Sequence, residues 1–383
     1  MAKQNILIEE ILNLIDGQTR NSLLISKIIL RKRKRLAALF AQKKVPRTIP
    51  KNKKYLETIN RMPNDVFYSH FRMQISTFEK LYCMLEPLWS KLSTGRPRSS
   101  LKKCLYMTIW KLSNQSSFRE VSDRFNIGMG ACYRGFIQCI QIISAQKQII
   151  VFPTTELTQK RVMEAFESYR SHPFPYVLGC IHGTHIKILQ PTKDGISYYN
   201  RKGTHSVIVQ AVADSNMRFL DVFIGYPGRC HDAAVWSASP LKRAIVNGLI
   251  SFPPECHLLG DAAYPLETYL MVPYKDNGFL SEAQTTYNNI LSSTRVCVEQ
   301  AFGVLKKKFR ILNFLEVHDI KLAKNIIMSC FVLHNYILEH KGNPDGVIIE
   351  NVPHTEINTL PADGNQRSEA SAKRERLTNL LSA

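Results

Sequence analysis

Hydrophobic residues recur at helical spacing through most of the first 170 residues. Residues 1–44 read as two helices that break near Gly17, and residues 67–170 carry the same pattern throughout. Apolar residues at every third or fourth position give a helix one buried face. The pattern therefore predicts that this part of the chain is helical.

Between residues 176 and 265 the pattern changes to short apolar runs, which are typical of buried strands. Long helices return over residues 287–339, one of them over about Thr294–Arg310. Because a short link joins the second and third strands, these two are expected to pair antiparallel. Together the elements predict an α/β core with four strands, at Tyr176–Leu189, Val207–Ala213, Phe219–Gly225 and Cys256–Gly260.

Proline, glycine and lysine mark the segments between these parts. Residues 45–66 contain three prolines and many lysines, which favours a linker or extended arm. Residues 342–366 are polar, which favours a flexible tail, and a short charged helix is expected at Glu369–Leu381. We therefore expect four segments: a basic helical arm and linker at 1–66, a helical domain at 67–170, an α/β core at 171–340 and a flexible tail at 341–383.

The charge of the chain is strongly positive and is concentrated near the N-terminus. Among 383 residues, 51 Lys and Arg stand against 31 Asp and Glu, a net charge of +20. Residues 1–61 carry +11 of this charge, in part through the unbroken run Arg31-Lys32-Arg33-Lys34-Arg35. An excess of this size attracts polyanions, of which nucleic acid is the first candidate. The run is also typical of a nuclear import signal, although it can equally form a solvated helix face.

Several other classes of protein are disfavoured by what the sequence lacks. No apolar stretch approaches the roughly 18 residues that a membrane helix needs, and acidic residues interrupt the N-terminal segment where a signal peptide would be apolar. The nine cysteines form no Cys-x-x-Cys pair, which favours reduced thiols. The absence of a Walker motif and of a Gly-x-Ser-x-Gly elbow argues against an NTPase and a serine hydrolase. We expect a nuclear protein, or a cytoplasmic one when a required partner is missing.

Two predicted helices in the helical domain have the spacing of a helix-turn-helix. The helix Leu101–Asn114 is followed by a short helix, Phe118–Phe125. Ser117 can cap the start of this second helix, and a glutamate three residues later completes a capping box. A turn with Gly128 then leads into a helix that begins at Met129. Helices joined by such a turn are the DNA-binding geometry, although helical hairpins also occur in other all-helical domains.

If this hairpin binds DNA, its contacts come from two places. Arg134 and Gln138 form the polar face of the helix that follows the turn. Arg96 and Arg98 lie upstream on an extended segment with glycine and proline, which can enter a minor groove or can be a basic loop.

Two acidic residues stand where α/β proteins place catalytic groups. Asp261 directly follows the predicted strand Cys256–Gly260, and active sites gather at the carboxyl ends of strands. Glu299 lies within a predicted helix, with Arg295 and Lys306 on the same face. This set is either a salt-bridged surface or a metal ligand with phosphate-binding cations beside it.

Five motifs in order over about 125 residues resemble the PIF/Harbinger superfamily of DDE transposases and the host nucleases derived from them. The resemblance covers about residues 67–340. The motifs are Ile181-His182-Gly183-Thr184-His185-Ile186, Tyr199-Asn200-Arg201-Lys202-Gly203, Tyr226-Pro227-Gly228-Arg229-Cys230-His231-Asp232, Gly260-Asp261-Ala262-Ala263-Tyr264-Pro265, and Arg295 through Val298-Glu299-Gln300-Ala301-Phe302-Gly303 to Lys306.

The resemblance implies an RNase H-like DDE core behind a helical helix-turn-helix region that binds DNA. In that family three carboxylates hold two divalent metals, Mg²⁺ or Mn²⁺, for the cleavage of phosphodiesters and the transfer of strands. Asp261 and Glu299 match the second and third carboxylates. The resemblance also implies double-stranded DNA with transposon terminal repeats as substrate, a Myb-like accessory protein as partner, and a homodimer.

His182 stands where the family motif has its first aspartate. An imidazole cannot bridge two metals, carries no negative charge, and suits Zn²⁺ or Ni²⁺ better than Mg²⁺. We therefore expect weak Mg²⁺ binding and severely reduced or absent turnover. If Leu189 faces Val207 in the sheet, His182 faces Asp214, which makes Asp214 a candidate substitute ligand. A register slip of one residue would turn Asp214 to the other face.

The remaining motif residues allow two interpretations each. Arg201 and Lys202, together with Arg295 and Lys306, either hold DNA phosphates or belong to basic loops and surface ion pairs. Asp232 either helps to orient the site or caps the next helix.

Two functions follow from the sequence. The first is a Harbinger-type transposase or nuclease whose catalysis is impaired at His182. The alternative is a catalytically inactive, transposase-derived scaffold that binds DNA or chromatin. DNA binding that persists without metal while cleavage is undetectable would favour the scaffold.

Overall fold

The computed structural model describes residues 30–34, 51–90, 99–340 and 364–382. The chain divides into two compact units, residues 1–50 and residues 51–383. In the first unit, residues 30–34 are helical and three of the predicted DNA-binding residues are exposed, namely Arg31, Arg33 and Lys34, while Lys32 is half-buried. Three other residues that were predicted to bind DNA lie outside the described residues. They are Arg35, from the same basic run, and Arg96 and Arg98, from the segment before the helical hairpin.

The second unit begins with a helical part that is built around aromatic side chains. The rings of Phe67 and Phe71 lie 4.6 Å apart, and Phe78 stacks on Tyr106 at 4.2 Å. The helices are α3 (Tyr55–Asn60), α4 (Asn64–Phe71), α5 (Ile75–Ser90), α6 (Leu101–Asn114), α7 (Phe118–Arg124), α8 (Met129–Ser144), the 3₁₀ turn η1 (Lys147–Ile149) and α9 (Glu156–Glu167).

The core is built on a mixed five-stranded sheet with the strand order β3-β2-β1-β4-β5. The first three strands pair antiparallel, whereas β4 is parallel to β1 and β5 is parallel to β4. Four strands agree with the sequence prediction to within two residues, and the short β5 was not predicted. The strands are β1 (Val177–Lys187), β2 (Ser206–Ala213), β3 (Phe219–Pro227), β4 (His257–Leu259) and β5 (Leu270–Met271).

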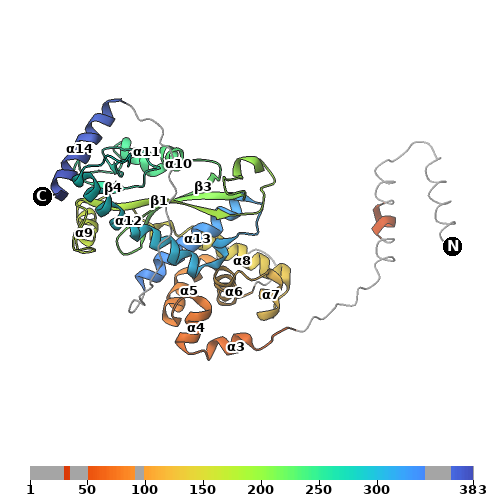
Figure 1. Cartoon of the computed structure of the whole chain (residues 1–383). Coiled ribbons are helices and arrows are strands. Elements are labelled where there is room, and N and C mark those ends of the chain that lie inside the picture. The colour runs from red at the N-terminus through yellow and green to blue at the C-terminus, as the bar shows by residue number, and fades with distance from the viewer. Residues whose placement is uncertain (1–29, 35–50, 91–98, 341–363, 383) are drawn as a thin grey trace, which may run out of the picture. The chain divides into compact units, whose positions relative to one another are not determined.

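Helices cover both faces of this sheet (Figure 1). On one face, Phe302 and Phe331 pack on Phe219, with ring centroids 5.4 and 4.5 Å apart. On the other face, Trp236 is fully buried in a second hydrophobic cluster with Ile181. The helices of the first face are α12 (Glu282–Lys308) and α13 (Ile320–Glu339), and those of the second are α10 (Asp232–Ala238) and α11 (Pro240–Val246). The 3₁₀ turns η2 (Gly195–Tyr198) and η3 (Arg310–Asn313) complete the core.

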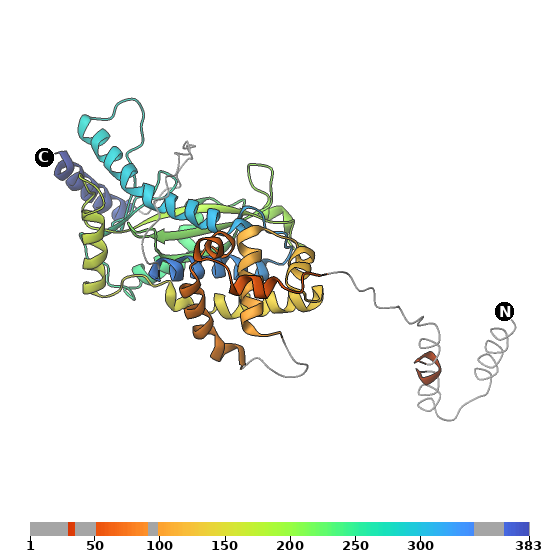
Figure 2. The same ribbon diagram turned by 90° about the horizontal axis from the view of Figure 1, so that it is seen from below.

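The helical part and the core share one hydrophobic cluster, which runs from Tyr55 to Leu377. The hydroxyl of Ser329 on α13 donates a hydrogen bond to the carbonyl of Ile140 on α8, at 3.1 Å. Figure 2 shows α3–α8 gathered beside α13. The structure therefore differs from the predicted division into two domains near residue 170. It also differs from the predicted linker, because α3 and the start of α4 lie within residues 45–66 and bury Tyr55 and Ile59.

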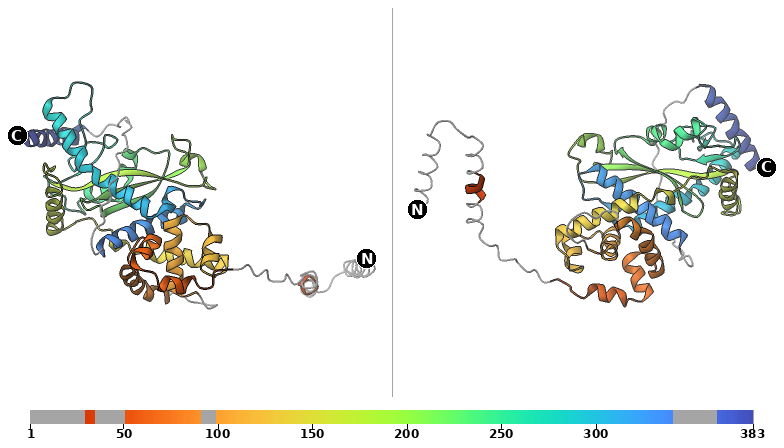
Figure 3. Two further views of the ribbon diagram at one scale, coloured as in Figure 1. Left: turned by 60° about the horizontal axis from the view of Figure 1, so that its bottom comes forward. Right: turned by 180° about the vertical axis from the view of Figure 1, so that it is seen from behind.

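The C-terminal helix α14 (Gly364–Ser382) is packed on the core, where the sequence predicted a flexible tail closed by a short helix. Its Lys373 is buried, and Thr378 shares a 2.9 Å hydrogen bond with Tyr274. Figure 3 shows α14 against the N-terminal half of α12, away from the helices α3–α8. In the described parts of the chain, no helix combines the length and the apolar character needed to cross a membrane.

The pairing register of β1 and β2 corrects one expectation. His182 lies opposite Ala211 and not opposite Asp214. Asp214 instead follows the end of β2, where its Oδ1 accepts hydrogen bonds from the backbone N–H groups of Asn216 and Arg218, both at 2.9 Å. The connection between β1 and β2 contains η2 and an isolated bridge between Tyr199 and His205. Because of this irregular connection, the pairing register of the two strands could not be derived from the number of residues between them. Asp214 therefore organises a turn and is not a substitute for the missing carboxylate.

Candidate active site

The strand register brings His182 and Asp261 together. Cys180 of β1 lies beside Leu259 of β4 in a parallel pair, so two residues further along each chain His182 and Asp261 are neighbours. Nδ1 of His182 lies 3.3 Å from Oδ2 of Asp261 and donates to it. The residues of β1 are fully buried up to Ile181 and partly exposed from His182 to Thr184, so the site opens at His182.

Arg295 of α12 joins the two predicted acidic residues. Its Nη2 lies 3.5 Å from Oδ2 of Asp261, and its Nη1 lies 3.8 Å from Oε1 of Glu299. The residue is only 3% exposed, so its charge is compensated inside the protein. The prediction that Arg295 binds DNA is not supported by this position, because the guanidinium is buried against the two carboxylates.

The electrostatics of Asp261 follow from these neighbours. Burial alone would raise the pKa of its carboxyl, but the hydrogen bond from His182 and the positive charge of Arg295 outweigh burial. The pKa of Asp261 therefore lies below its ordinary value, and the group is ionised at neutral pH.

Asp232 adds a carboxylate that sequence analysis treated as secondary. Asp232 is the first residue of α10 and not its N-cap, so the interpretation that Asp232 caps the helix is wrong. The N-cap is His231, whose side chain makes no capping hydrogen bond. The Asp232 carboxyl lies directly over Gly183, where an added Cβ would be 2.4 Å from Oδ1. Burial raises the pKa of Asp232, and the nearby charge of Asp261 raises it further. The only sequence signal was its place in the motif that ends at Asp232.

Tyr264 lies in the same neighbourhood and is fully buried. Its hydroxyl has no hydrogen-bond partner within the described structure. Burial raises its pKa well above the ordinary value, and the charges of Asp232 and Asp261 contribute to the increase. A buried hydroxyl without a partner is unusual and calls for an explanation.

Basic residues border the carboxylates along the open half of β1. Nζ of Lys306 donates to Oγ1 of Thr184 at 2.7 Å and to the carbonyl of His185 at 3.4 Å. Burial lowers the pKa of Lys306 to about 8, and the positive charge of Lys202 adds to this effect. The exposed Arg201 donates to Nε2 of His231 at 2.9 Å. The sequence prediction of a cationic group beside the acids is thus consistent with the positions of Arg201, Lys202 and Lys306.

Asn200 holds the turn that carries Arg201 and Lys202. Its side-chain amide donates to Oγ of Ser206 at 2.8 Å, and its Oδ1 accepts from the backbone N–H of Lys202 at 2.9 Å. Gly228 of the next motif packs so tightly here that an added Cβ would lie 2.2 Å from Oγ of Ser206. These contacts explain why glycine and asparagine occur in the two motifs.

The residues of the three family positions do not fit a pair of divalent metals. Within the described residues, no three His, Cys, Asp or Glu side chains stand close enough together to hold a metal ion. His182 and Arg295 already partner Asp261, and Arg295 also partners Glu299. Two metals need carboxylates that are free to bridge them, so the predicted ligand set of Asp261, Glu299 and Asp214 is not assembled.

The helical hairpin has the predicted elements. Ser117 and Glu120 form the capping box of α7, and α8 begins at Met129 after a turn at Gly128. On α8, Arg134 is exposed and Gln138 is half-buried. The arrangement leaves the N-terminal half of α8 accessible.

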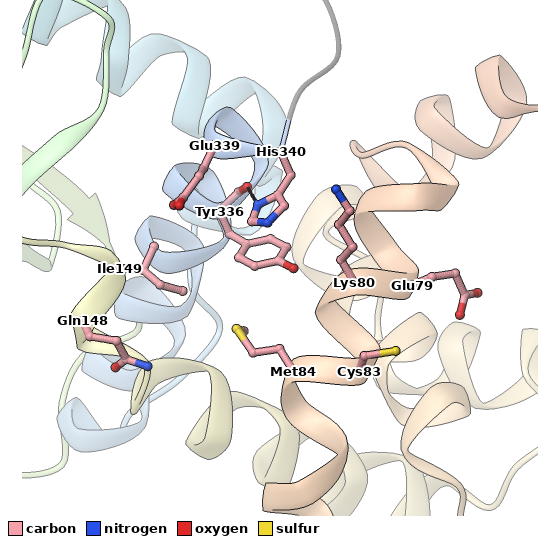
Figure 4. A pocket seen from close by; sticks show the side chains of 9 residues that line it. All are labelled: Glu79, Lys80, Cys83, Met84, Gln148, Ile149, Tyr336, Glu339 and His340. Carbon is pink, nitrogen blue, oxygen red and sulfur yellow. Dashed lines mark hydrogen bonds between the residues drawn. The ribbon is translucent and has the colours of Figure 1, made fainter.

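A separate cavity of about 630 Å³ lies between α5, η1 and the end of α13 (Figure 4). Cys83, Ile149 and Tyr336 are among the residues that line it. None of the carboxylates of the candidate site lies at this cavity, so the two are distinct.

Comparison with known proteins agrees with this geometry. Residues 181–335, which hold His182, Asp232, Asp261 and Glu299, match the family described as DDE superfamily endonuclease. The chain carries a DDE endonuclease domain and is homologous to the Harbinger-derived nucleases. For such a domain the mixed sheet with its flanking helices is an RNase H-like core.

Proteins of animals and plants are similar to this chain over most of its length. HARBI1 of Homo sapiens, whose name describes it as a nuclease, is 27% identical over 292 residues, which are 74% of this chain and 82% of that protein. The ALP1-like protein of Arabidopsis thaliana is 25% identical over 292 residues, covering 71% and 70%. Antagonist of like heterochromatin protein 1, also from Arabidopsis thaliana, is 23% identical over 300 residues, covering 73% and 75%. No solved structure matches the chain significantly.

Proposed function

We propose that this Harbinger-type protein binds double-stranded DNA and that His182 impairs its cleavage of phosphodiesters. The proposal rests on one observation. His182 pairs with Asp261, and Arg295 pairs with both Asp261 and Glu299, so the carboxylates that would hold two metals already have partners. The positive border of Arg201, Lys202 and Lys306 supports DNA binding beside these acids. The net charge of +20 supports it as well.

A second candidate is the catalytically inactive scaffold. One Arabidopsis relative is named antagonist of like heterochromatin protein 1, and this name associates the relative with chromatin. In this chain the scaffold is supported by the buried Arg295, whose positive charge pairs with both acids. The two candidates share DNA binding and differ only in residual cleavage.

The first prediction is that DNA binding does not need a metal. In EDTA we expect a dissociation constant of about 10⁻⁴ to 10⁻⁶ M for random duplex DNA at physiological salt, because contacts to phosphates supply the free energy of non-specific binding. Arg134→Ala on α8 should weaken binding and lower the salt slope by about one. Fluorescence anisotropy at several salt concentrations measures both quantities. Lys160→Ala, on the exposed face of α9, is the matched control, and an Arg134→Ala protein with unchanged affinity and slope would contradict the role of α8.

The second prediction concerns pH. Lys306 has a pKa of about 8, below its ordinary value, so it is charged below pH 8 and loses its charge above. The affinity for DNA should therefore fall from pH 7 to pH 9, by no more than about tenfold for each pH unit because one proton is linked. Lys202 lies close to Lys306. The pKa of His185 is lowered by burial and by the charges of Lys202 and Lys306, so His185 stays neutral over this range.

Lys306→Arg is the control for this effect, because arginine keeps its charge throughout the range. Anisotropy titrations at pH 7, 8 and 9 in EDTA should show a flatter profile for this variant than for the unmodified protein. Two identical profiles would show that Lys306 does not contact the DNA.

Three further assignments follow from the Harbinger resemblance and are proposed here without a structural observation of their own. They are location in the nucleus, a Myb-like accessory partner and a homodimer that handles two ends of double-stranded DNA. The terminal repeats of a transposon would be the specific sites.

A further inference from the structure

Two large apolar side chains are exposed on the connection between β1 and β2. Ile196, in the 3₁₀ turn η2, is 76% exposed, and Tyr199, directly after this turn, is 51% exposed. The backbone N–H of Tyr199 donates to the carbonyl of Ile196 at 3.1 Å, so the two residues belong to one turn. A single exposed apolar residue is ordinary on a protein surface, whereas a pair on one turn calls for an explanation.

This pair is accompanied by positive charge. The backbone N–H of Arg229, in the loop after β3, donates to the carbonyl of Ser197 within η2 at 3.1 Å. The turn also contains an acid, Asp194, whose carboxylate accepts a hydrogen bond from the hydroxyl of Ser197 at 2.8 Å. Four cations on the two connections are exposed, namely Lys193, Arg201, Lys202 and Arg229. The surface around the apolar pair therefore attracts phosphates.

The backbone of the turn is fixed by contacts with its neighbours. Tyr199 and His205 form an isolated antiparallel bridge, and their rings lie 5.3 Å apart. A Cβ at Gly228 would lie 2.8 Å from the carbonyl oxygen of Tyr198, so the loop after β3 packs directly on η2. A ligand that binds this turn does not have to order it first, which lowers the entropic cost of binding.

The turn lies beside the candidate site. Arg201, two residues after Tyr199, donates to Nε2 of His231 at 2.9 Å, and Lys202 lies close to Lys306. A DNA backbone that is bound at these cations therefore passes next to the turn. Its bases are then the groups that Ile196 and Tyr199 meet.

We propose that Ile196 and Tyr199 stack on bases of the bound DNA, so that the protein prefers a duplex that contains an unpaired base. Every base has a flat face that stacks on aromatic side chains, and cations beside the ring hold the phosphates. Isoleucine is among the apolar wedges that enter unstacked base steps. Within a perfect duplex the neighbouring bases cover these faces. The inference rests on the proposed DNA binding and names the form of DNA that is preferred.

The test compares two fluorescent duplexes that differ only in a short mismatched bubble at the centre of one of them. Anisotropy titrations of the full chain in EDTA measure both affinities. We expect the bubble to bind at least about fivefold more tightly, the lower end of what one base stacked on an aromatic side chain contributes. Ile196→Ala and Tyr199→Ala should each reduce this preference and leave the affinity for the perfect duplex nearly unchanged.

Two further variants serve as controls. Tyr199→Phe keeps the ring and should keep the preference for the bubble. Leu249→Ala removes a side chain that is 78% exposed, as Ile196 is, but belongs to the segment after α11, and it should bind both duplexes like the unmodified protein. Ile196→Ala changes only an exposed side chain, so it keeps the proposal testable when Tyr199→Ala disturbs the turn.

A second readout reports the stacking itself. The base analogue 2-aminopurine, placed in the bubble, loses fluorescence when it stacks. At saturating protein its fluorescence should fall with the unmodified chain and with Tyr199→Phe, and should fall less with Tyr199→Ala. Because the protein is saturating, a smaller change reports lost stacking and not weaker binding.

The outcomes separate this inference from the proposed function. Equal affinity of the unmodified chain for the two duplexes overturns the inference and leaves the proposed function standing, whereas a chain that binds neither contradicts both. A loss in Tyr199→Ala that is equal for the two duplexes also overturns it, because the turn then contacts DNA without reading a base.

The other occupant of this surface would be a second copy of the chain. Sedimentation without DNA detects it, and a dimer that Ile196→Ala dissociates, with an unchanged preference for the bubble, overturns the proposal. Loss of the preference in both alanine variants, with Tyr199→Phe and Leu249→Ala unchanged, supports it.

Discussion

His182→Asp is expected to raise the Mg²⁺-dependent nicking of DNA at least about 100-fold over the protein with His182. The change supplies the first carboxylate of the DDE set beside Asp261, at a distance where the imidazole now donates a hydrogen bond. A metal ion contributes several kcal/mol of charge stabilisation in the transition state. Since each 1.4 kcal/mol is tenfold in rate, about 3 kcal/mol suffices for this increase.

The measurement is the conversion of supercoiled plasmid to nicked circles with Mg²⁺ or Mn²⁺. His182→Asn is the matched control, because it removes the imidazole without adding a charge and should stay inactive. His182→Asp combined with Asp261→Ala should also be inactive, which excludes a contaminating nuclease. Cleavage by the unmodified protein that Asp261→Ala abolishes would show that His182 does not impair the site.

The same variant gives a readout that does not depend on cleavage. Without metal, His182→Asp places a carboxylate beside the ionised Asp261, so the repulsion between like charges should lower the melting temperature. A ligand that binds only the folded state stabilises it. Millimolar Mg²⁺ should therefore raise the melting temperature of His182→Asp and leave that of His182→Asn nearly unchanged.

The sequence predicted the elements of the site better than their contacts. The strands were recognisable because each is a short apolar run, and Asp261 was placed correctly because it follows one of them. The connection from β1 to β2 is long and irregular. Only the folded sheet therefore shows the register in which His182 lies opposite Ala211 and not opposite Asp214.

Burial separates two residues that the sequence placed on one helix face. Arg295 and Lys306 occupy the same face of α12, but the first is sealed against two acids and the second reaches Thr184 beside the open part of β1. Asp232 could not be chosen over other acids without seeing the space above Gly183. Periodicity assigns a residue to a face, whereas the element that packs on that face decides whether the residue pairs internally or meets a ligand.

Lys373→Met is expected to destabilise the second unit by about 3–5 kcal/mol. Nζ of this buried lysine donates to the carbonyls of Pro254, Cys256 and Thr268, at 2.7, 2.8 and 2.7 Å. Methionine keeps most of the packing volume but leaves three carbonyls without a donor, and each unsatisfied buried group costs about 1–3 kcal/mol. The low hydrophobicity of α14 made a docked helix hard to predict, since polar contacts such as those of Lys373 and Thr378 hold it on the core.

The three carbonyls flank the segment that carries Asp261, because Cys256 precedes β4 and Thr268 precedes β5. Loss of Lys373 should therefore loosen the site as well as the helix. Arg376→Ala, on the exposed face of the same helix, should change the melting temperature little, whereas Lys373→Met should lower it by roughly 5 °C. Calorimetry measures both. If the two variants melt together, α14 is not held by Lys373, and the position of Asp261 depends on the sheet alone.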